Sequence, residues 1–265
     1  MCAFTALGQL TVDNSRTPEE LVRDVLVGQG VSVSNVTFNL GPGNVISDQI
    51  GAFDGASSNI GLSAGIVLAT GGIQVVTGPN TRRDATLMPA FPHPTPDQDL
   101  LQLAGSAVGL DPAILEFDLI PSGDSVRFRF VFGSEEYPEY VCALYNDVFG
   151  FFLSGPGVNG PFENDAINLA LIPGTEVPIA INTVNPGVRG TLPYPLPTND
   201  NLCYFADPNW RDNRIYYVDN TGGTTHQLDG TTVSLTVNRR TIGSLPSMLP
   251  AHLKPAISLA SCYFC

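Results

Sequence analysis

One alternating run of side chains constrains the fold of this chain more than any other feature. The segment Ser125–Gly133 reads SVRFRFVFG, and its apolar residues recur at every second position from Val126 to Phe132. Its two arginines occupy intervening positions, so they belong to the other face. In an extended strand, alternate side chains point to opposite faces of the sheet. The pattern therefore predicts a half-buried β-strand with one aromatic face.

The same block continues into an acidic stretch and then into a second apolar run. Residues 134–147 read SEEYPEYVCALYND, and residues 148–153 read VFGFFL. This order predicts two strands that build core, joined by a loop that carries carboxylates and tyrosines. We expect that loop to hold the functional groups, because its side chains are not needed for the core.

Composition extends this pattern to the whole chain. Among 265 residues there are 27 glycines and 22 prolines, which favour many short strands joined by turns. We count about eight to ten strand-like runs and one short N-terminal helix that begins at Thr17, with Glu20 completing a capping box. The predicted fold is all-β, an antiparallel, jelly-roll-like β-sandwich in one domain.

The charge balance excludes several partners. The formal net charge is −13, and the chain has a single lysine, Lys254. Phosphate binding requires a basic patch, so we expect no nucleic acid partner and no attraction to anionic membranes. Because no run of 18 apolar residues occurs, we also expect no membrane insertion.

Both ends of the chain differ from its middle. Residues 1–8 are short, uncharged and apolar, and they read either as the remnant of a secretory signal peptide or as an ordinary first strand. Residues 9–238 form the predicted sandwich. Residues 239–265 alternate poorly and contain two adjacent arginines, the lysine and three prolines, so we expect an atypical, truncated or disturbed tail outside the sandwich.

Two of the five cysteines lie within the body of the domain. Cys142 and Cys203 can form a disulfide in an oxidising compartment, provided that the fold brings their Cα atoms close together.

The acidic stretch is a candidate calcium site. Calcium takes several oxygen ligands, and carboxylates, amide oxygens and loop carbonyls supply them. The alternative is that these side chains cap turns by accepting hydrogen bonds from backbone amides. The candidate ligands are Glu135, Glu136, Asn146 and Asp147, joined by Asp97 and Asp99 if the fold brings that segment near.

The other chemistry-bearing residues allow further interpretations. Paired carboxylates invite a glycoside hydrolase interpretation. Adjacent strand residues point to opposite faces, so Glu135 and Glu136 are unsuited to flank one bond, whereas the pair Glu136 and Asp147 is compatible with that geometry. The three tyrosines of the stretch can stack on sugars, grip a partner protein or pack over the end of the sandwich. These are Tyr137, Tyr140 and Tyr145. We expect the three histidines, His93, His226 and His252, at the surface.

Three segments together resemble a bacterial secreted module, the choice-of-anchor L domain. They are TPEELVRDVLVGQGVSVSNVTF with the following IGAF, then NIGLSAGIVLATG, and then the long LEFDLIPSGDSVRFRFVFGSEEYPEYVCALYNDVFGFFLSGPG. The resemblance covers about residues 9–237. Members of the family usually continue with a stretch like YHLKLAIAD, and this chain has AHLKPAISLAS in its place.

The resemblance implies a secreted, surface-associated module without enzymatic activity. On that basis we expect an extracellular role in adhesion or in building extracellular structure, including filaments. The oxygen ligands of the acidic stretch add calcium as an expected stabilising ion. The expected partners are other protein subunits or surface glycans. If the tail leaves a strand out of the sandwich, the exposed sheet edge can capture a strand from a neighbouring subunit. A carbohydrate-binding module is the alternative, and a glycoside hydrolase is a weaker one.

Overall fold

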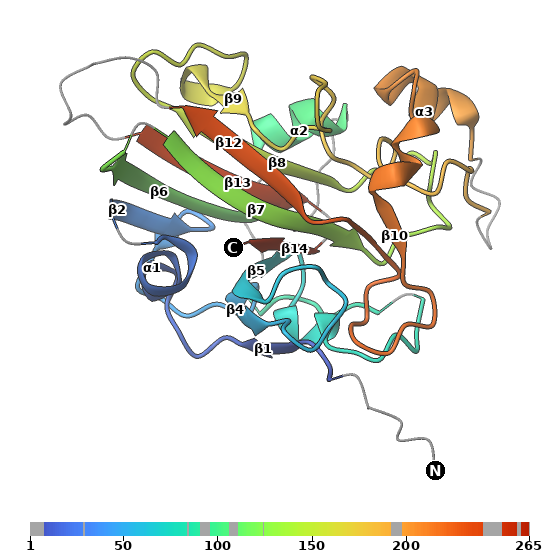
Figure 1. Ribbon diagram of the computed structural model, residues 1–265, viewed down its shortest axis with the longest axis horizontal. Helices are drawn as coiled ribbons and strands as arrows, with labels where there is room; N and C mark the ends of the chain where they lie inside the picture. The colour runs from blue at the N-terminus through green and yellow to red at the C-terminus, as the bar shows by residue number, and fades with distance from the viewer. Residues whose placement is uncertain are drawn as a thin grey trace.

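The computed structural model describes residues 8–28, 30–83, 85–90, 96–105, 111–123, 125–191, 198–240, 251–258 and 261–264. Within these residues, fourteen strands form two sheets, and every strand pairing is antiparallel. The all-β sandwich predicted from the sequence is therefore confirmed. The two sheets, with short helices around them, are seen in Figure 1.

The larger sheet has the order β1-β4-β5-β14-β7-β11-β10, and β12 also pairs with β7. In that order the strands are β1 (Thr11–Asp13), β4 (Ile50–Asp54), β5 (Ala64–Ala69), β14 (Ser261–Phe264), β7 (Ser125–Ser134), β11 (Gly230–Thr232) and β10 (Tyr217–Asp219), with β12 at Leu235–Arg240. The smaller sheet has the order β3-β2-β6-β13-β8-β9. Its strands are β3 (Gly41–Pro42), β2 (Val31–Phe38), β6 (Ala113–Pro121), β13 (Ala251–Ser258), β8 (Val148–Ser154) and β9 (Ile167–Asn168).

The main core lies between the two sheets. The aromatic face of β7 packs against β8, with ring centroids 5.0 Å apart for Phe128 and Phe151 and 5.1 Å apart for Phe130 and Phe149. Each such buried side chain stabilises the fold by about 1.5–3 kcal/mol relative to an exposed one. A second cluster, which includes Val131 of β7, buries residues of β5 as well. The larger sheet is therefore covered on both faces near its middle.

The helices are short and begin where the sequence supplies a cap. Helix α1 (Pro18–Leu21) has the predicted capping box between Thr17 and Glu20, and it continues as one π-helical segment, η1 (Val22–Leu26). Helix α2 (Gln98–Ala104) begins at Asp97, whose side chain accepts a hydrogen bond from the Leu100 amide. Helix α3 is Asp200–Ala206, and the 3-10 segments are η2 (Ile73–Val76), η3 (Glu163–Asp165) and η4 (Asp212–Tyr216).

The C-terminal segment differs from its prediction. Strand β13 lies between β6 and β8 in the smaller sheet, and β14 lies between β5 and β7 in the larger one. The described part of 239–265 thus completes both sheets instead of forming a tail outside the sandwich. Strand β13 makes two sets of electrostatic contacts that hydrophobic alternation does not reveal. His252 lies between Glu116 and Asp118 of β6, and the lone lysine pairs with two aspartates near α2.

A second difference concerns residues 177–184, whose apolar residues favour a strand but which form turns with isolated bridges. Polar side chains cause this, because they bond to nearby backbone in place of a neighbouring strand. Thr183 donates to the Pro178 carbonyl, and Asn185 donates to the Ile181 carbonyl. This turn region lies directly beside the acidic stretch.

Candidate functional site: the acid loop and its pocket

The acidic stretch 135–147, here called the acid loop, connects β7 to β8. Ser134 at the end of β7 draws the two ends of the loop together. Its hydroxyl donates to Asp147 Oδ2 at 2.6 Å and accepts from the Glu136 amide at 2.9 Å. Asp147 is completely buried. The prediction of two strands joined by a loop that carries the carboxylates is therefore confirmed.

The loop carboxyls hold their protons unusually well. Burial raises the pKa of Glu135 to about 8, with a further contribution from the nearby Asp229 charge. Burial and the charge of Glu139 raise the pKa of Glu136 to about 7. Burial and Glu136 raise the pKa of Asp147 well above its usual value. Desolvation disfavours the charged form of each acid, and the like charges reinforce this effect.

Four carboxyl oxygens in this region are buried and lack a hydrogen-bond partner. They are Glu135 Oε1, Glu139 Oε2, Asp147 Oδ1 and Asp229 Oδ2. Three belong to the acid loop, and the fourth precedes β11. Buried polar atoms are nearly always satisfied in folded proteins, so a concentration of unsatisfied oxygens marks a site suited to a proton or a cation.

The structure separates the six predicted calcium ligands. Glu135 accepts from the Ala85 amide, and Asn146 accepts from the Asn182 amide at 3.0 Å, as turn-capping side chains do. Asp97 and Asp99 do not join them, because both carboxylates pair with Lys254 beside α2. Across the described part of the chain, no group of three or more His, Cys, Asp or Glu side chains is arranged to hold a metal ion. Calcium stays a prediction.

A disulfide ties the acid loop to α3. Cys142 and Cys203, the pair considered from the sequence, are bonded with their Cα atoms 5.0 Å apart. The Asn199 amide, at the start of α3, also donates to the Cys142 carbonyl at 2.8 Å. Helix α3 interrupts the proline-rich stretch 185–209, whose composition favours an irregular connection. The Asn199 cap followed by Asp200 was the signal that could have revealed it.

The three tyrosines of the loop have different environments. Tyr137 is completely buried against Tyr217, and its hydroxyl donates to the Val184 carbonyl, so of the three roles considered for it only packing over the end of the sandwich fits. The ring of Tyr137 fills the end of the core. Tyr140 is half-buried and meets the ring of Tyr145, which is 48% exposed.

The histidines are less exposed than predicted. His226 is buried, its ring contacts Asn220, and burial lowers its pKa to about 4. His252 is half-buried, and its hydrogen bond to Glu116 raises its pKa. His93 lies outside the described residues.

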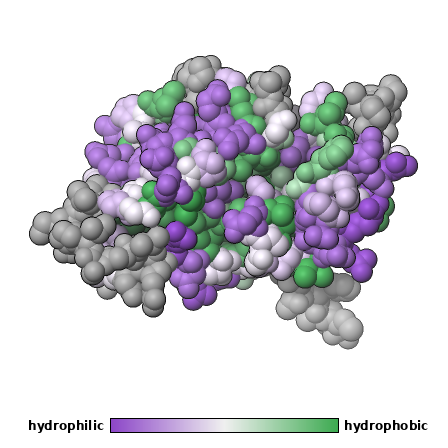
Figure 2. All heavy atoms as spheres, turned by 90° about the horizontal axis from the view of Figure 1, so that it is seen from above, coloured by the Kyte–Doolittle hydropathy of each residue, from purple (hydrophilic) through white to green (hydrophobic). Residues whose placement is uncertain are grey.

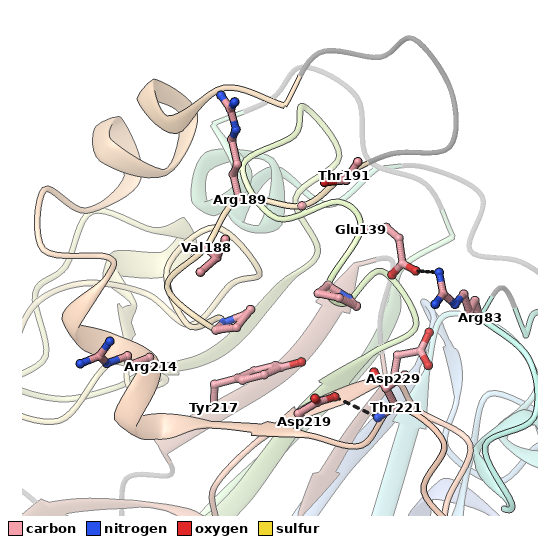
Figure 3. A pocket seen from close by; sticks show the side chains of 13 residues that line it. Arg83, Glu139, Val188, Arg189, Thr191, Arg214, Tyr217, Asp219, Thr221 and Asp229 are labelled. Atoms are coloured by element: carbon pink, nitrogen blue, oxygen red, sulfur yellow. Dashed lines mark hydrogen bonds and ion pairs between the residues drawn. The ribbon is translucent and has the colours of Figure 1, made fainter.

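A pocket of about 710 Å³ opens beside the acid loop (Figure 3). The segment 186–191 forms one wall, held by a hydrogen bond from the Gly190 amide to the Val141 carbonyl at 2.9 Å. A Cβ at Gly190 would collide with the Glu139 carbonyl, so this close approach requires glycine. The other lining residues come from the segment before α2, from the acid loop, from η4 and from the β10–β11 hairpin: Arg83, Pro138, Glu139, Arg214, Tyr217, Asp219, Thr221 and Asp229.

Sequence reasoning missed the residues that make this pocket polar. Arg83, Asp219 and Asp229 lie far from the acid loop in sequence, and only the β7–β11 pairing brings the last of them close. A possible signal was the Asp229-Gly230 turn that precedes a Thr-rich strand. In Figure 3, the Arg83 guanidinium lies beside the Glu139 carboxylate, and Asp229 lies below them.

Comparison with known proteins gives one family. The model of the choice-of-anchor L domain matches residues 11–244. Searches of the curated proteins and of the solved structures found no match. Within the described ranges, none of the helices combines the length and apolar character needed to span a bilayer.

Proposed function

The chain belongs to the choice-of-anchor L family, and from this premise we propose that it is a non-enzymatic extracellular module that binds other proteins through its acid-loop end. The choice-of-anchor L domain is a surface-associated module. In our proposal the module serves adhesion or the building of extracellular structure, and the protein that carries it is secreted or displayed at the cell surface.

The observation that carries this proposal is the concentration of exposed apolar side chains around the acid loop. Eleven large apolar residues are exposed among those described, and six of them lie in the acid loop, in the wall 186–191, in α3 or in η4. The six are Leu144, Tyr145, Val188, Tyr204, Phe205 and Ile215, of which Phe205 is 80% exposed. Grouped exposed apolar side chains are typical of protein-binding surfaces. On the one face seen in Figure 2, apolar side chains lie in several places among hydrophilic ones.

The disulfide supports an extracellular location. Disulfides persist in oxidising compartments and are rare in the cytosol. The Cys142–Cys203 bond also fixes Leu144 and Tyr145 relative to Tyr204 and Phe205, since the two cysteines lie next to these residues in sequence. A surface that is held rigid before binding loses less conformational entropy when it binds.

Most edges of the two sheets are too short for strand capture. The strands at the ends of the two pairing orders are β1, β10, β3 and β9, and each has only two or three residues, whereas the six-residue β12 pairs with β7 alone among the described strands. Short edge strands offer little backbone to a foreign strand. If the protein builds filaments, we propose that subunits meet through the acid-loop end and not through an open edge.

Two observations separate this proposal from its alternatives. The exposed rings do not form a flat platform for sugar stacking, because the Tyr204 and Phe205 rings are inclined by 66° and the Tyr140 and Tyr145 rings by 78°. A glycoside hydrolase needs two accessible carboxyls that flank one bond. Asp147, the predicted counterpart of Glu136, is completely buried. Both observations favour a protein partner.

Calcium enters the proposal as a stabilising ion only. The buried oxygens Glu135 Oε1 and Asp147 Oδ1 lack partners, and a cation beside them would relieve their desolvation. Since no three metal-binding side chains converge within the described residues, backbone carbonyls and water would supply most ligands.

A peptide-display selection tests the proposal. The purified chain is immobilised through its N-terminus, and a random peptide library is selected against it, with a glycan array probed in parallel. We expect enriched peptides that bind the chain and no glycan signal. Glycan binding without peptide enrichment would overturn the proposal in favour of a carbohydrate-binding module.

A further inference from the structure

We propose that the pocket beside the acid loop binds the ammonium group of a lysine side chain, presented by a partner polypeptide, between Glu139 and Asp229. This inference rests on the proposed function, because it names the chemistry of the partner that the acid-loop end would recognise. The proposed function depends only on the exposed apolar residues, whereas binding of the lysine also depends on the pocket.

The first support is the pair of half-satisfied carboxylates. Asp229 is 1% exposed, and its Oδ1 accepts from Asn80 Nδ2 at 2.8 Å, while its Oδ2 has no partner. Glu139 Oε1 accepts from Arg83, while its Oε2 has no partner. Both residues line the pocket. A donor between the two free oxygens would satisfy both, and a positively charged donor would also relieve their mutual repulsion.

The second support is Arg83, which shows that the pocket accepts a cation on an aliphatic stem. Its guanidinium lies 2.9 Å from Glu139 Oε1, although its side chain is 74% exposed. Exposed ion pairs contribute little to stability, so this contact leaves the pocket open to competition. Asp229 Oδ2 and Glu139 Oε2 beside it have no hydrogen-bond partner, and both atoms are buried.

The third support is the shape of the pocket, which suits an organic cation better than a metal ion. Pro138, Pro186, Val188 and the ring of Tyr217 supply apolar walls for an alkyl chain. In Figure 3, the hydroxyl end of Tyr217 is turned toward the side that holds Glu139 and Asp229. A lysine ammonium offers three donors, which match two carboxylate oxygens and one hydroxyl.

Charge complementarity identifies the partner further. The chain has a net charge of −13, and its single lysine is buried between Asp97 and Asp99, so a second copy cannot present it. The partner is therefore a different polypeptide. Arg189 and Arg214 also line the pocket, on the side away from Glu139 in Figure 3. They favour a partner segment in which an acidic residue lies next to the lysine.

Two short peptides test the inference. Acetyl-Gly-Lys-Asp-Gly-amide is titrated into the isotope-labelled chain and followed by amide chemical shifts, beside the same peptide with norleucine in place of lysine. We expect saturable binding of the lysine peptide and at least tenfold weaker binding of the norleucine peptide. Asp229→Asn should weaken the lysine peptide at least tenfold as well, whereas the exposed control Glu176→Gln should leave it unchanged.

The variants are chosen so that a folding defect cannot hide the answer. Asparagine at 229 keeps the acceptor for Asn80, and Glu139→Gln is a second variant that should also weaken binding tenfold. Equal binding of the two peptides, or unchanged binding by both variants, would overturn the inference. Peptides that bind through Tyr145 and Phe205 without a lysine requirement would overturn it too, while leaving the proposed function intact.

Discussion

Lys254 Nζ on β13 lies 3.0 Å from Asp97 Oδ2 and also contacts the Asp99 carboxylate, which joins the C-terminal strand to α2 across more than 150 residues of sequence. All three side chains are nearly buried. Burial opposes the charged lysine, yet its bonds to the two aspartates outweigh burial and raise its pKa. This contact fixes α2 and β13 relative to each other.

Removing that cation should destabilise the fold strongly. Lys254→Met leaves two buried carboxylates without their partner, and breaking a buried ion pair in this way costs about 3–5 kcal/mol. Urea unfolding measures the change. The control is Arg23→Met, which removes an exposed cation and should cost no more than about 0.5 kcal/mol. Equal effects of the two changes would refute a structural role for Lys254.

The disulfide should stabilise the chain mainly by restricting its unfolded state. It closes a loop with a sequence separation of 61 residues, for which the chain-entropy model gives about 4 kcal/mol. We expect Cys142→Ser with Cys203→Ser to lower the unfolding free energy by an amount of that order. Chemical reduction of the unmodified chain should reproduce the loss. No change in either experiment would mean that the bond does not form in solution.

Stability should fall as the pH rises from about 5 to 8. The folded-state pKa of Glu135 is about 8, that of Glu136 about 7 and that of Asp229 about 6, all above their usual values. The folded state therefore binds more protons than the unfolded state in this window. The stability that these acids provide is complete below the unfolded-state pKa values and is lost as the pH passes the folded-state values.

Thermal unfolding at several pH values measures this decrease of stability with rising pH. Glu135→Gln, which imitates the protonated acid, should make the decrease smaller. His226 acts in the opposite direction below about pH 6.5, because its lowered pKa means that acid favours the unfolded state. A melting temperature that rises steadily from pH 5 to 8 would contradict the buried acid cluster.

Calcium should raise the melting temperature weakly, at millimolar concentrations, and more at pH 8 than at pH 5, because the carboxyls must lose their protons to bind it. Asp147→Asn should abolish the increase, since it removes a carboxylate oxygen that has no partner. The comparison is unfolding with excess calcium and with a chelator. Identical curves at pH 8 would eliminate calcium as a stabilising ion.

Local signals predicted much of the fold. The Thr17–Glu20 capping box, the alternation of β7 and the apolar run of β8 each depend on neighbouring residues, and each is found where the sequence places it. The Cys142–Cys203 pair was also identified, because these were the two cysteines within the body of the domain.

The remaining features depend on distant partners that a single sequence does not reveal. Strand β13 lacks clear alternation, and its position follows from His252 and Lys254 meeting acids on other elements. The acid loop was located correctly, but Tyr137 is core and Asp229 was missed, because the pairing of β11 with β7 decides both environments.

The most direct measurement compares how strongly the selected peptides bind to two double variants of the chain. Peptides enriched on the unmodified chain are tested on Tyr145→Ser with Phe205→Ser, and on the control Leu40→Ser with Val45→Ser, which changes exposed apolar residues elsewhere. A protein-binding acid-loop end predicts that binding is lost on the first variant and retained on the second. Peptides that bind both variants as well as the unmodified chain, or a failure to enrich any peptide, would contradict the proposed function.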